Sequence, residues 1–211
     1  MTCAFDELFG ITDAFLAIPM AGRTDDAILS DALAAHQIAM DDRRVATYRD
    51  VYFKHLPREI GNPPSGARHG VMPGIRALLD ALADRGDVHM ALLTGNYAAS
   101  ARMKLEHFDL WRYFACGAFA GDAPDRNGLF DVARDRVAQR GGPSFDPRQV
   151  TVVGDTPHDI GVAIVAGARS IGVATGSHSP DVLRAAGADV VFDDLADTAA
   201  VFRALEIRDR E

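Results

Sequence analysis

Residues 150–159 read VTVVGDTPHD and give the clearest indication of the fold. Val150–Gly154 is a short, mostly β-branched run that ends in glycine, which is typical of a buried strand. Asp155 follows directly, and Asp159 lies in the first turn of a helix expected from about 158 to 166. A strand, a sharp turn and a helix in this order predict one βα unit of an α/β protein.

The same alternation extends over the sequence on both sides of this unit. Short apolar runs alternate with segments of helical periodicity, which indicates parallel strands joined by crossover helices in an open sheet. The further strands are expected at 89–94, 116–120, 170–174 and 189–192, and the further helices at 75–83, 98–107, 129–139, from 180 onward and at 196–205.

The first 70 residues follow a different pattern, with apolar residues spaced by three and four and no convincing strand. The two helical stripes are Ile28, Leu29, Ala32, Leu33 and His36, and Val45, Tyr48, Val51, Tyr52 and Leu56. Gly61–Gly66 is the densest cluster of helix-breaking residues and marks a boundary. We therefore predict a helical domain at 1–70 and an α/β core domain at 71–211.

Composition and charge exclude several classes of protein. The 211 residues are 48% hydrophobic and 25% charged, which is ordinary for a globular protein. The formal charge of −8 gives no general attraction for nucleic acid or anionic membranes. No apolar run is long enough to span a membrane, no signal peptide is evident, and Cys3 and Cys116 are too few for a disulfide framework. We expect a cytoplasmic protein without nucleic-acid or membrane partners.

Two carboxylates flank the start of the helix that follows the 150–154 strand. In an open parallel sheet, ligands bind at the carboxyl ends of the strands, so Asp155 and Asp159 can face the same cavity. Paired carboxylates on a loop suit Mg²⁺, which prefers oxygen ligands. The alternative is that one aspartate is the N-cap of the helix and the charge of the other, in the first turn, interacts favourably with the helix dipole.

The ends of two other strands also carry polar groups. Thr94-Gly95-Asn96 ends one strand and opens a helix, where backbone N–H groups can hold a phosphate, although an ordinary strand-to-helix turn has the same composition. Arg126 precedes the next helix and either reaches an anion or is solvated at the surface. His158 lies beside the two aspartates, and we expect it to face solvent.

Thr94-Gly95-Asn96, the later basic residue and VVGDTPHD at 152–159 together resemble the haloacid dehalogenase-like (HAD) hydrolase superfamily. The phosphoglycolate-phosphatase-like branch is the most similar. Gly22-Arg-Thr-Asp25 resembles the family's helical cap, and Val71–Ile75 resembles the return from cap to core. The resemblance implies a Rossmannoid parallel-sheet core with a small helical cap.

The resemblance also implies a mechanism, in which an aspartate on the first core strand attacks phosphorus and Mg²⁺ neutralises the phosphate. The residues carried over are Thr94, Gly95 and Asn96 for the phosphoryl group, Arg126 or Lys104 for its charge, Asp155 for Mg²⁺ with Asp159 in support, and Arg23 for the substrate. Among them Thr94, Arg126 and Asp155 would be catalytic.

The sequence departs from the family at its first motif, an apolar strand that ends in Asp-x-Asp-Gly-Thr. The one candidate, Phe5–Thr12, lacks the second aspartate, and Glu7–Ile11 fits the end of a helix better. We expect the central first strand to be absent, which leaves two unpaired inner strand edges, and the sequence to start downstream of its nucleophile. The 211-residue chain is then expected to be inactive.

The leading hypothesis is that this chain is most of a Mg²⁺-dependent phosphatase. The enzyme is expected to act on a small phosphorylated metabolite. One alternative is a non-catalytic relative that binds phosphate, Mg²⁺ or a partner. Another is a haloacid dehalogenase, against which the Asp155/Asp159 pair argues, because displacing a halide from carbon needs no metal. A phosphomutase stays open, as do the substrate and the oligomeric state.

Overall fold

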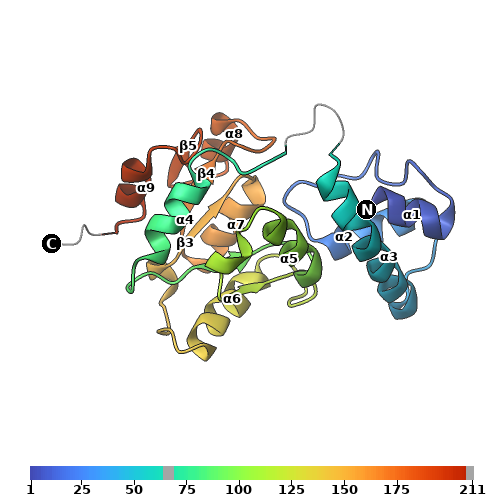
Figure 1. The fold of residues 1–211 in the computed structure, drawn as a ribbon, viewed down its shortest axis with the longest axis horizontal. Coiled ribbons are helices and arrows are strands. Elements are labelled where there is room, and N and C mark those ends of the chain that lie inside the picture. Colours follow the sequence, from blue (N-terminus) through green and yellow to red (C-terminus); the bar gives the residue numbers. More distant parts are fainter. Residues whose placement is uncertain (64–68, 208–211) are drawn as a thin grey trace.

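Three helices form the N-terminal part of the computed structural model, which describes residues 1–63 and 69–207 (Figure 1). They are α1 (Thr2–Phe9), α2 (Asp25–Ala35) and α3 (Asp42–Gly61). The two predicted stripes supply most of their buried contacts, and Phe5 of α1 packs between them. No described helix combines the length and the hydropathy needed to cross a membrane.

The rest of the described chain alternates between strands and helices as predicted. Its elements are α4 (Ile75–Ala83), β1 (Ala91–Leu93), α5 (Ala98–His107), β2 (Cys116–Ala118), α6 (Gly128–Gln139), β3 (Thr151–Gly154), α7 (Pro157–Ala166), β4 (Arg169–Val173), α8 (Pro180–Ala185), β5 (Val190–Phe192) and α9 (Thr198–Ala204). Every predicted strand and helix is present within a few residues of its expected bounds. The α/β class is confirmed.

The strands form two separate parallel sheets. One has the order β1-β2, with Ala91 opposite Cys116, and the other has the order β3-β4-β5, with Val153 opposite Ile171. Among the described residues, no strand joins β1 to β3. The prediction of two inner edges without a central strand is confirmed for this part of the chain.

The inner edges are visible in the hydrogen bonds. The Thr94 amide donates to the Ala118 carbonyl at 3.0 Å, so by the alternation of a parallel ladder the amide and carbonyl of Leu93 point away from β2. The Arg169 amide likewise donates to Val150 at 3.0 Å, which turns the backbone groups of Val153 away from β4. The Val153 side chain is 44% exposed, unusual for the middle of a core strand.

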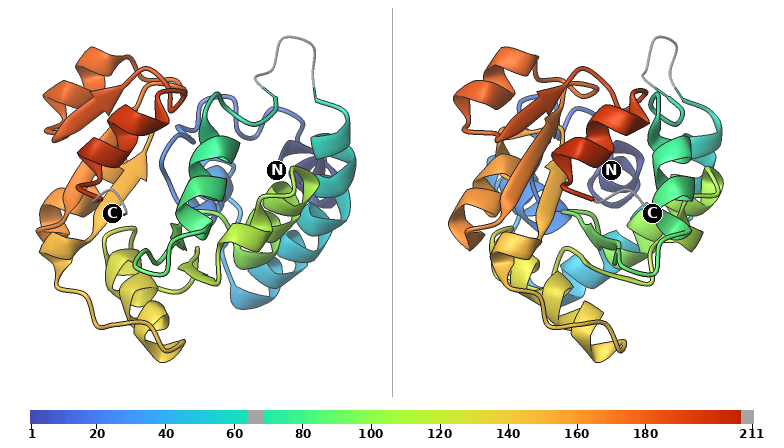
Figure 2. Two further views of the ribbon diagram at one scale, coloured as in Figure 1. Left: turned by 60° about the vertical axis from the view of Figure 1, so that its left-hand side comes forward. Right: turned by 90° about the vertical axis from the view of Figure 1, so that its left-hand side faces the viewer.

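Helix packing joins the two sheets where strand pairing does not. Leu93 of β1 packs against a buried cluster of Phe130 from α6, Val152 from β3 and Val162 from α7. Figure 2 shows the strands with α6 and α7 on one side and the N-terminal helices beyond the strand ends.

Side-chain caps fix where several helices begin. The Thr24 hydroxyl accepts from the Ala27 amide at 3.2 Å at the start of α2, and Ser179 caps α8 before Pro180. At α7 the cap is Thr156, not Asp155, which corrects the alternative in which Asp155 is the helix cap.

Residues 64–66 of the breaker cluster and the tail at 208–211, expected to fray, lie outside the described residues.

Candidate active site

A cavity of about 590 Å³ lies where the ends of β1 and β3 meet the N-terminal helices. Its walls therefore come from three parts of the sequence that are far apart. All seven predicted site residues line it: Arg23, Thr94, Gly95, Asn96, Arg126, Asp155 and Asp159.

The turn from β3 into α7 is built around Asp159. Its Oδ2 accepts from the Thr156 amide at 3.0 Å and from the Thr156 hydroxyl at 2.8 Å, in a capping box at the helix start. Gly154 permits this approach, because a Cβ at that position would lie 2.3 Å from the Asp159 side chain. Asp159 is thus a buried structural carboxylate as well as a cavity residue.

Arg126 binds the other oxygen of Asp159. Its Nη2 donates to Asp159 Oδ1, so both oxygens of this carboxylate have protein partners. A direct metal bond to Asp159 would compete with that ion pair. The Arg126 Nε is a buried donor for which no described residue provides an acceptor, and a buried donor of this kind calls for a partner.

Asp155, unlike Asp159, has no ion-pair partner among the described residues. It is partly buried. Burial raises the pKa of the Asp155 carboxyl, and the negative charge of Asp159 raises it further. A cation beside Asp155 would offset both effects.

The donor set fits Mg²⁺ through Asp155. Mg²⁺ is commonly bound by one or two carboxylates, with water and substrate oxygens completing its shell. Residues 1–63 and 69–207 contain no cluster of three or more His, Cys, Asp or Glu residues placed to hold a metal, so no all-protein cage is present there. Asp155 would bind the ion directly, and Asp159 would act through water.

The turn after β1 brings a hydroxyl and an amide to the cavity. The backbone amide of Asn96 donates to Thr94 Oγ1 at 3.2 Å, and its side-chain Nδ2 donates to the same oxygen at 2.8 Å. A Cβ on Gly95 would lie 2.3 Å from the Arg23 carbonyl oxygen, so this glycine lets the start of α2 approach closely.

One short segment, Gly22–Thr24, touches both strand ends. A Cβ on Gly22 would lie 2.6 Å from the Thr156 hydroxyl, while Arg23 and Thr24 abut Gly95. The Arg23 side chain lines the cavity and pairs with Asp31 at 2.7 Å.

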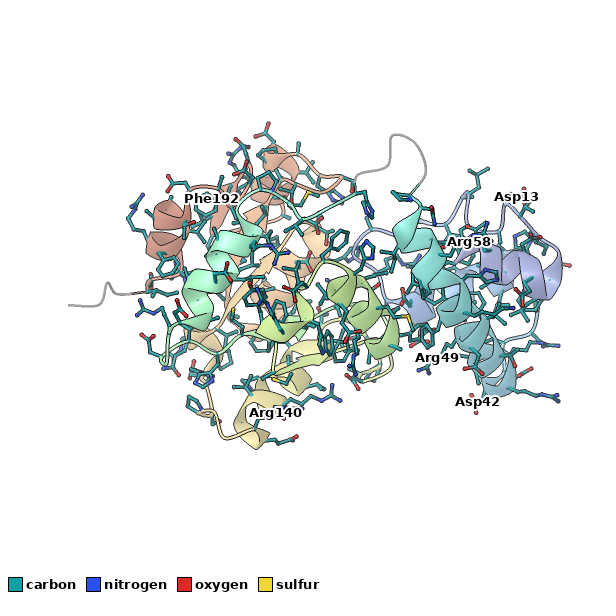
Figure 3. All side chains as sticks on the ribbon, viewed as in Figure 1. Asp13, Asp42, Arg49, Arg58, Arg140 and Phe192 are labelled. Carbon is teal, nitrogen blue, oxygen red and sulfur yellow. The ribbon has the colours of Figure 1, made fainter. Side chains whose placement is uncertain are left out.

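Asp25 is a buried residue that sequence analysis treated only as part of the cap. Its Oδ2 accepts from the Tyr97 amide at 2.9 Å and the Ser100 hydroxyl at 3.3 Å, and burial raises the pKa of its carboxyl. Figure 3 labels Arg49 on α3, whose guanidinium lies 4.5 Å from the Tyr97 ring centroid. No sequence signal pointed to this role beyond the place of Asp25 in the Gly22–Asp25 segment.

The structure also places three further residues that bear on the site. Lys104 of α5 lines the cavity and donates to the Asn96 side chain. His158 is exposed, as expected. Asp6, the aspartate of the candidate segment Phe5–Thr12, lies exposed on α1 and does not line the cavity.

Part of the chain matches a known family model and a curated relative. Residues 126–198 match a family model described as HAD-hydrolase-like. A curated relative from Dickeya dadantii, "Probable phosphatase IndB", is 33% identical over 140 residues, which are 64% of this chain and 57% of the relative. The chain thus spans 57% of the length of that curated relative.

Solved structures share the fold at low sequence identity. A hydrolase from Pseudomonas syringae is 19% identical, with a TM-score of 0.67 over 98% of this chain and 93% of that one. CbbY from Rhodobacter sphaeroides, solved in complex with phosphate, is 15% identical, with a TM-score of 0.69 over 93% of this chain and 85% of that one. The fold is that of these structures, and residues 126–198 resemble the HAD-hydrolase-like family.

Proposed function

We propose that the chain belongs to a Mg²⁺-dependent phosphatase that acts on a small phosphorylated metabolite. The observation that carries the proposal is the meeting of Thr94, Arg126 and Asp155 at one cavity, from three strand ends. A hydroxyl donor, a guanidinium and a lone carboxylate suit a bound phosphoryl group and the cation that accompanies it.

Each group has a distinct role in this proposal. Arg126 supplies positive charge, and its unpartnered Nε would donate to a phosphoryl oxygen. Thr94 donates a hydrogen bond to the phosphoryl group, and Asp155 holds Mg²⁺. The ion would neutralise part of the phosphate charge, which lowers the barrier to attack on phosphorus.

The 211 residues contain no Asp-x-Asp-Gly-Thr segment, the motif in which the resemblance places the attacking aspartate. We therefore expect this chain to bind phosphate and Mg²⁺ but to turn over little or no substrate. A phosphate-binding protein without catalysis is the second candidate, and the same missing motif favours it.

Two assays separate these candidates. The first measures inorganic phosphate binding and Mg²⁺-dependent hydrolysis of p-nitrophenyl phosphate by the wild-type chain, the Asp155→Ala variant and the Thr94→Val variant. We expect wild-type phosphate binding that both variants weaken by about ten-fold or more, without turnover. Robust wild-type turnover that Asp155→Ala abolishes would sink the claim of inactivity.

The second assay adds what the sequence lacks. An apolar strand ending in Asp-x-Asp-Gly-Thr is fused before Met1, with a matched fusion in which both aspartates are asparagines. Mg²⁺-dependent turnover by the first fusion alone supports the phosphatase. Failure of the fusion to hydrolyse any phosphomonoester, despite intact phosphate binding, favours the binding protein.

A further inference from the structure

Lys104 occupies an unusual position for a lysine. The chain has two lysines, and Lys54 lies on the outer face of α3, where it pairs with Glu7 at 2.9 Å. Lys104 instead lies in α5 with its ammonium at the cavity, where burial lowers its pKa and the negative charge of Asp25 opposes that effect. Its hydrogen bond goes to the side-chain oxygen of Asn96.

This contact fixes the orientation of the Asn96 amide. An ammonium group has donors and no acceptor, so the atom that it contacts must be the amide oxygen. The Asn96 Nδ2 then points the other way, toward Thr94 Oγ1 at 2.8 Å. With the amide reversed, two donors would face each other.

The fixed amide in turn fixes the role of the Thr94 hydroxyl. A hydroxyl has one donor and two acceptor lone pairs. Here Thr94 Oγ1 accepts from both the backbone amide and the side-chain Nδ2 of Asn96, which uses both lone pairs. Only its hydrogen remains, and Thr94 lines the cavity.

We propose that Lys104 is a positioning residue that, through the amide of Asn96, makes the Thr94 hydroxyl an obligate hydrogen-bond donor to the cavity. The inference rests on the proposed function, because the ligand that matches such a donor is an oxyanion with acceptor atoms only, such as a deprotonated phosphoryl oxygen. Lys104 need not touch that ligand. Its role differs from that of a cation that neutralises phosphate, which Arg126 fills.

The decisive test is a double-mutant cycle on inorganic phosphate affinity with Lys104→Met and Asn96→Ala. Lys104→Met is expected to weaken binding by about ten-fold in the wild-type background and by less than about two-fold once Asn96 is alanine, because the route to Thr94 is then already broken. Lys104→Arg, which keeps a donor, is expected to restore most of the affinity. Lys54→Met is the matched control for lost charge and should leave affinity unchanged.

An equal loss in both backgrounds would overturn the inference, because Lys104 would then contact the anion directly. No loss with Lys104→Met would overturn it as well. If the wild-type chain fails to bind phosphate at all, the proposed function fails, and NMR of the ligand-free protein then tests the inference alone.

The NMR readout is the side-chain NH₂ of Asn96, one of three asparagines in the sequence. In the wild type its two protons should be well resolved and slow to exchange, and Lys104→Met should abolish that protection while Lys104→Arg preserves it. Identical Asn96 side-chain signals in the wild type and Lys104→Met would overturn the inference without reference to any ligand.

Discussion

At the scale of single residues, Asp155 and Asp159 lie four positions apart and should respond oppositely to the loss of charge. The folded-state pKa of Asp155 is raised by burial and by Asp159. Its stabilising contribution is therefore present at acid pH, below the pKa of the unfolded chain, and is lost as pH rises through the raised value. At neutral pH, ionised Asp155 destabilises the fold.

We expect Asp155→Asn to raise the Tm at pH 7.5 by about 2 °C, with the gain shrinking toward pH 4. Asp159→Asn should lower the Tm by more than about 5 °C, because it breaks the capping box and leaves Arg126 buried without its partner. Thermal unfolding of both variants in metal-free buffer between pH 4 and 8 measures the contrast. A lower Tm for Asp155→Asn at pH 7.5 would contradict the assignment of Asp155 as an uncompensated charge.

At the scale of elements, the contact between the β1–α5 turn and the start of α2 depends on Gly95. A Cβ there would lie 2.3 Å from the Arg23 carbonyl oxygen and 2.9 Å from the Thr24 Cα, both of them backbone atoms. We expect Gly95→Ala to lower the free energy of unfolding by about 2 kcal/mol or more, because a backbone must move.

Gly161 in the middle of α7 is the matched control, since a Cβ there would meet nothing within 4 Å. Gly161→Ala should stabilise the chain by about 0.5–1 kcal/mol through helix propensity. Urea unfolding of both variants gives the comparison. A neutral Gly95→Ala would mean that the two segments are not in contact in solution.

The elements themselves were largely predictable, because apolar periodicity and capping residues act over a few neighbours. The bounds of α5 were predicted without error at Ala98–His107. Three features of the site were not predicted: the capping of α7 by Thr156, the ion pair of Arg126 with Asp159, and the burial of Asp25. Each depends on a partner brought near by tertiary packing, which local spacing does not encode. The rule that parallel strand ends meet at one edge predicted a shared cavity for the residues that follow strands, whereas Arg23 was predicted only from the resemblance.

At the scale of the whole molecule, the division of the sheet leaves backbone groups of Leu93 and Val153 without a strand partner in the described chain. Amide hydrogen exchange should report this directly. We expect the amides of Leu93 and Val153 to exchange at least about 100-fold faster than that of Ile171, which lies on the central strand β4.

The measurement is made at several protein concentrations, because unpaired strand edges favour association. Protection at Leu93 and Val153 equal to that at Ile171 in dilute solution would contradict an open gap. Protection that grows with concentration would show that a second molecule covers the edges.

Gly22–Thr24 rests on the tips of both sheets, with Gly22 against Thr156 and Arg23 against Gly95. The segment therefore connects the β1-β2 sheet to the β3-β4-β5 sheet at the cavity. A tilt of the N-terminal helices that moves Gly22–Thr24 away would leave only the packing of α6 and α7 to join the two sheets in the described chain. Access to the cavity and the spacing of Thr94 and Asp155 would then change together. A ligand bound by both Thr94 and Asp155 would hold the two sheets together. Through Gly22–Thr24 it would also hold the N-terminal helices in place over the cavity.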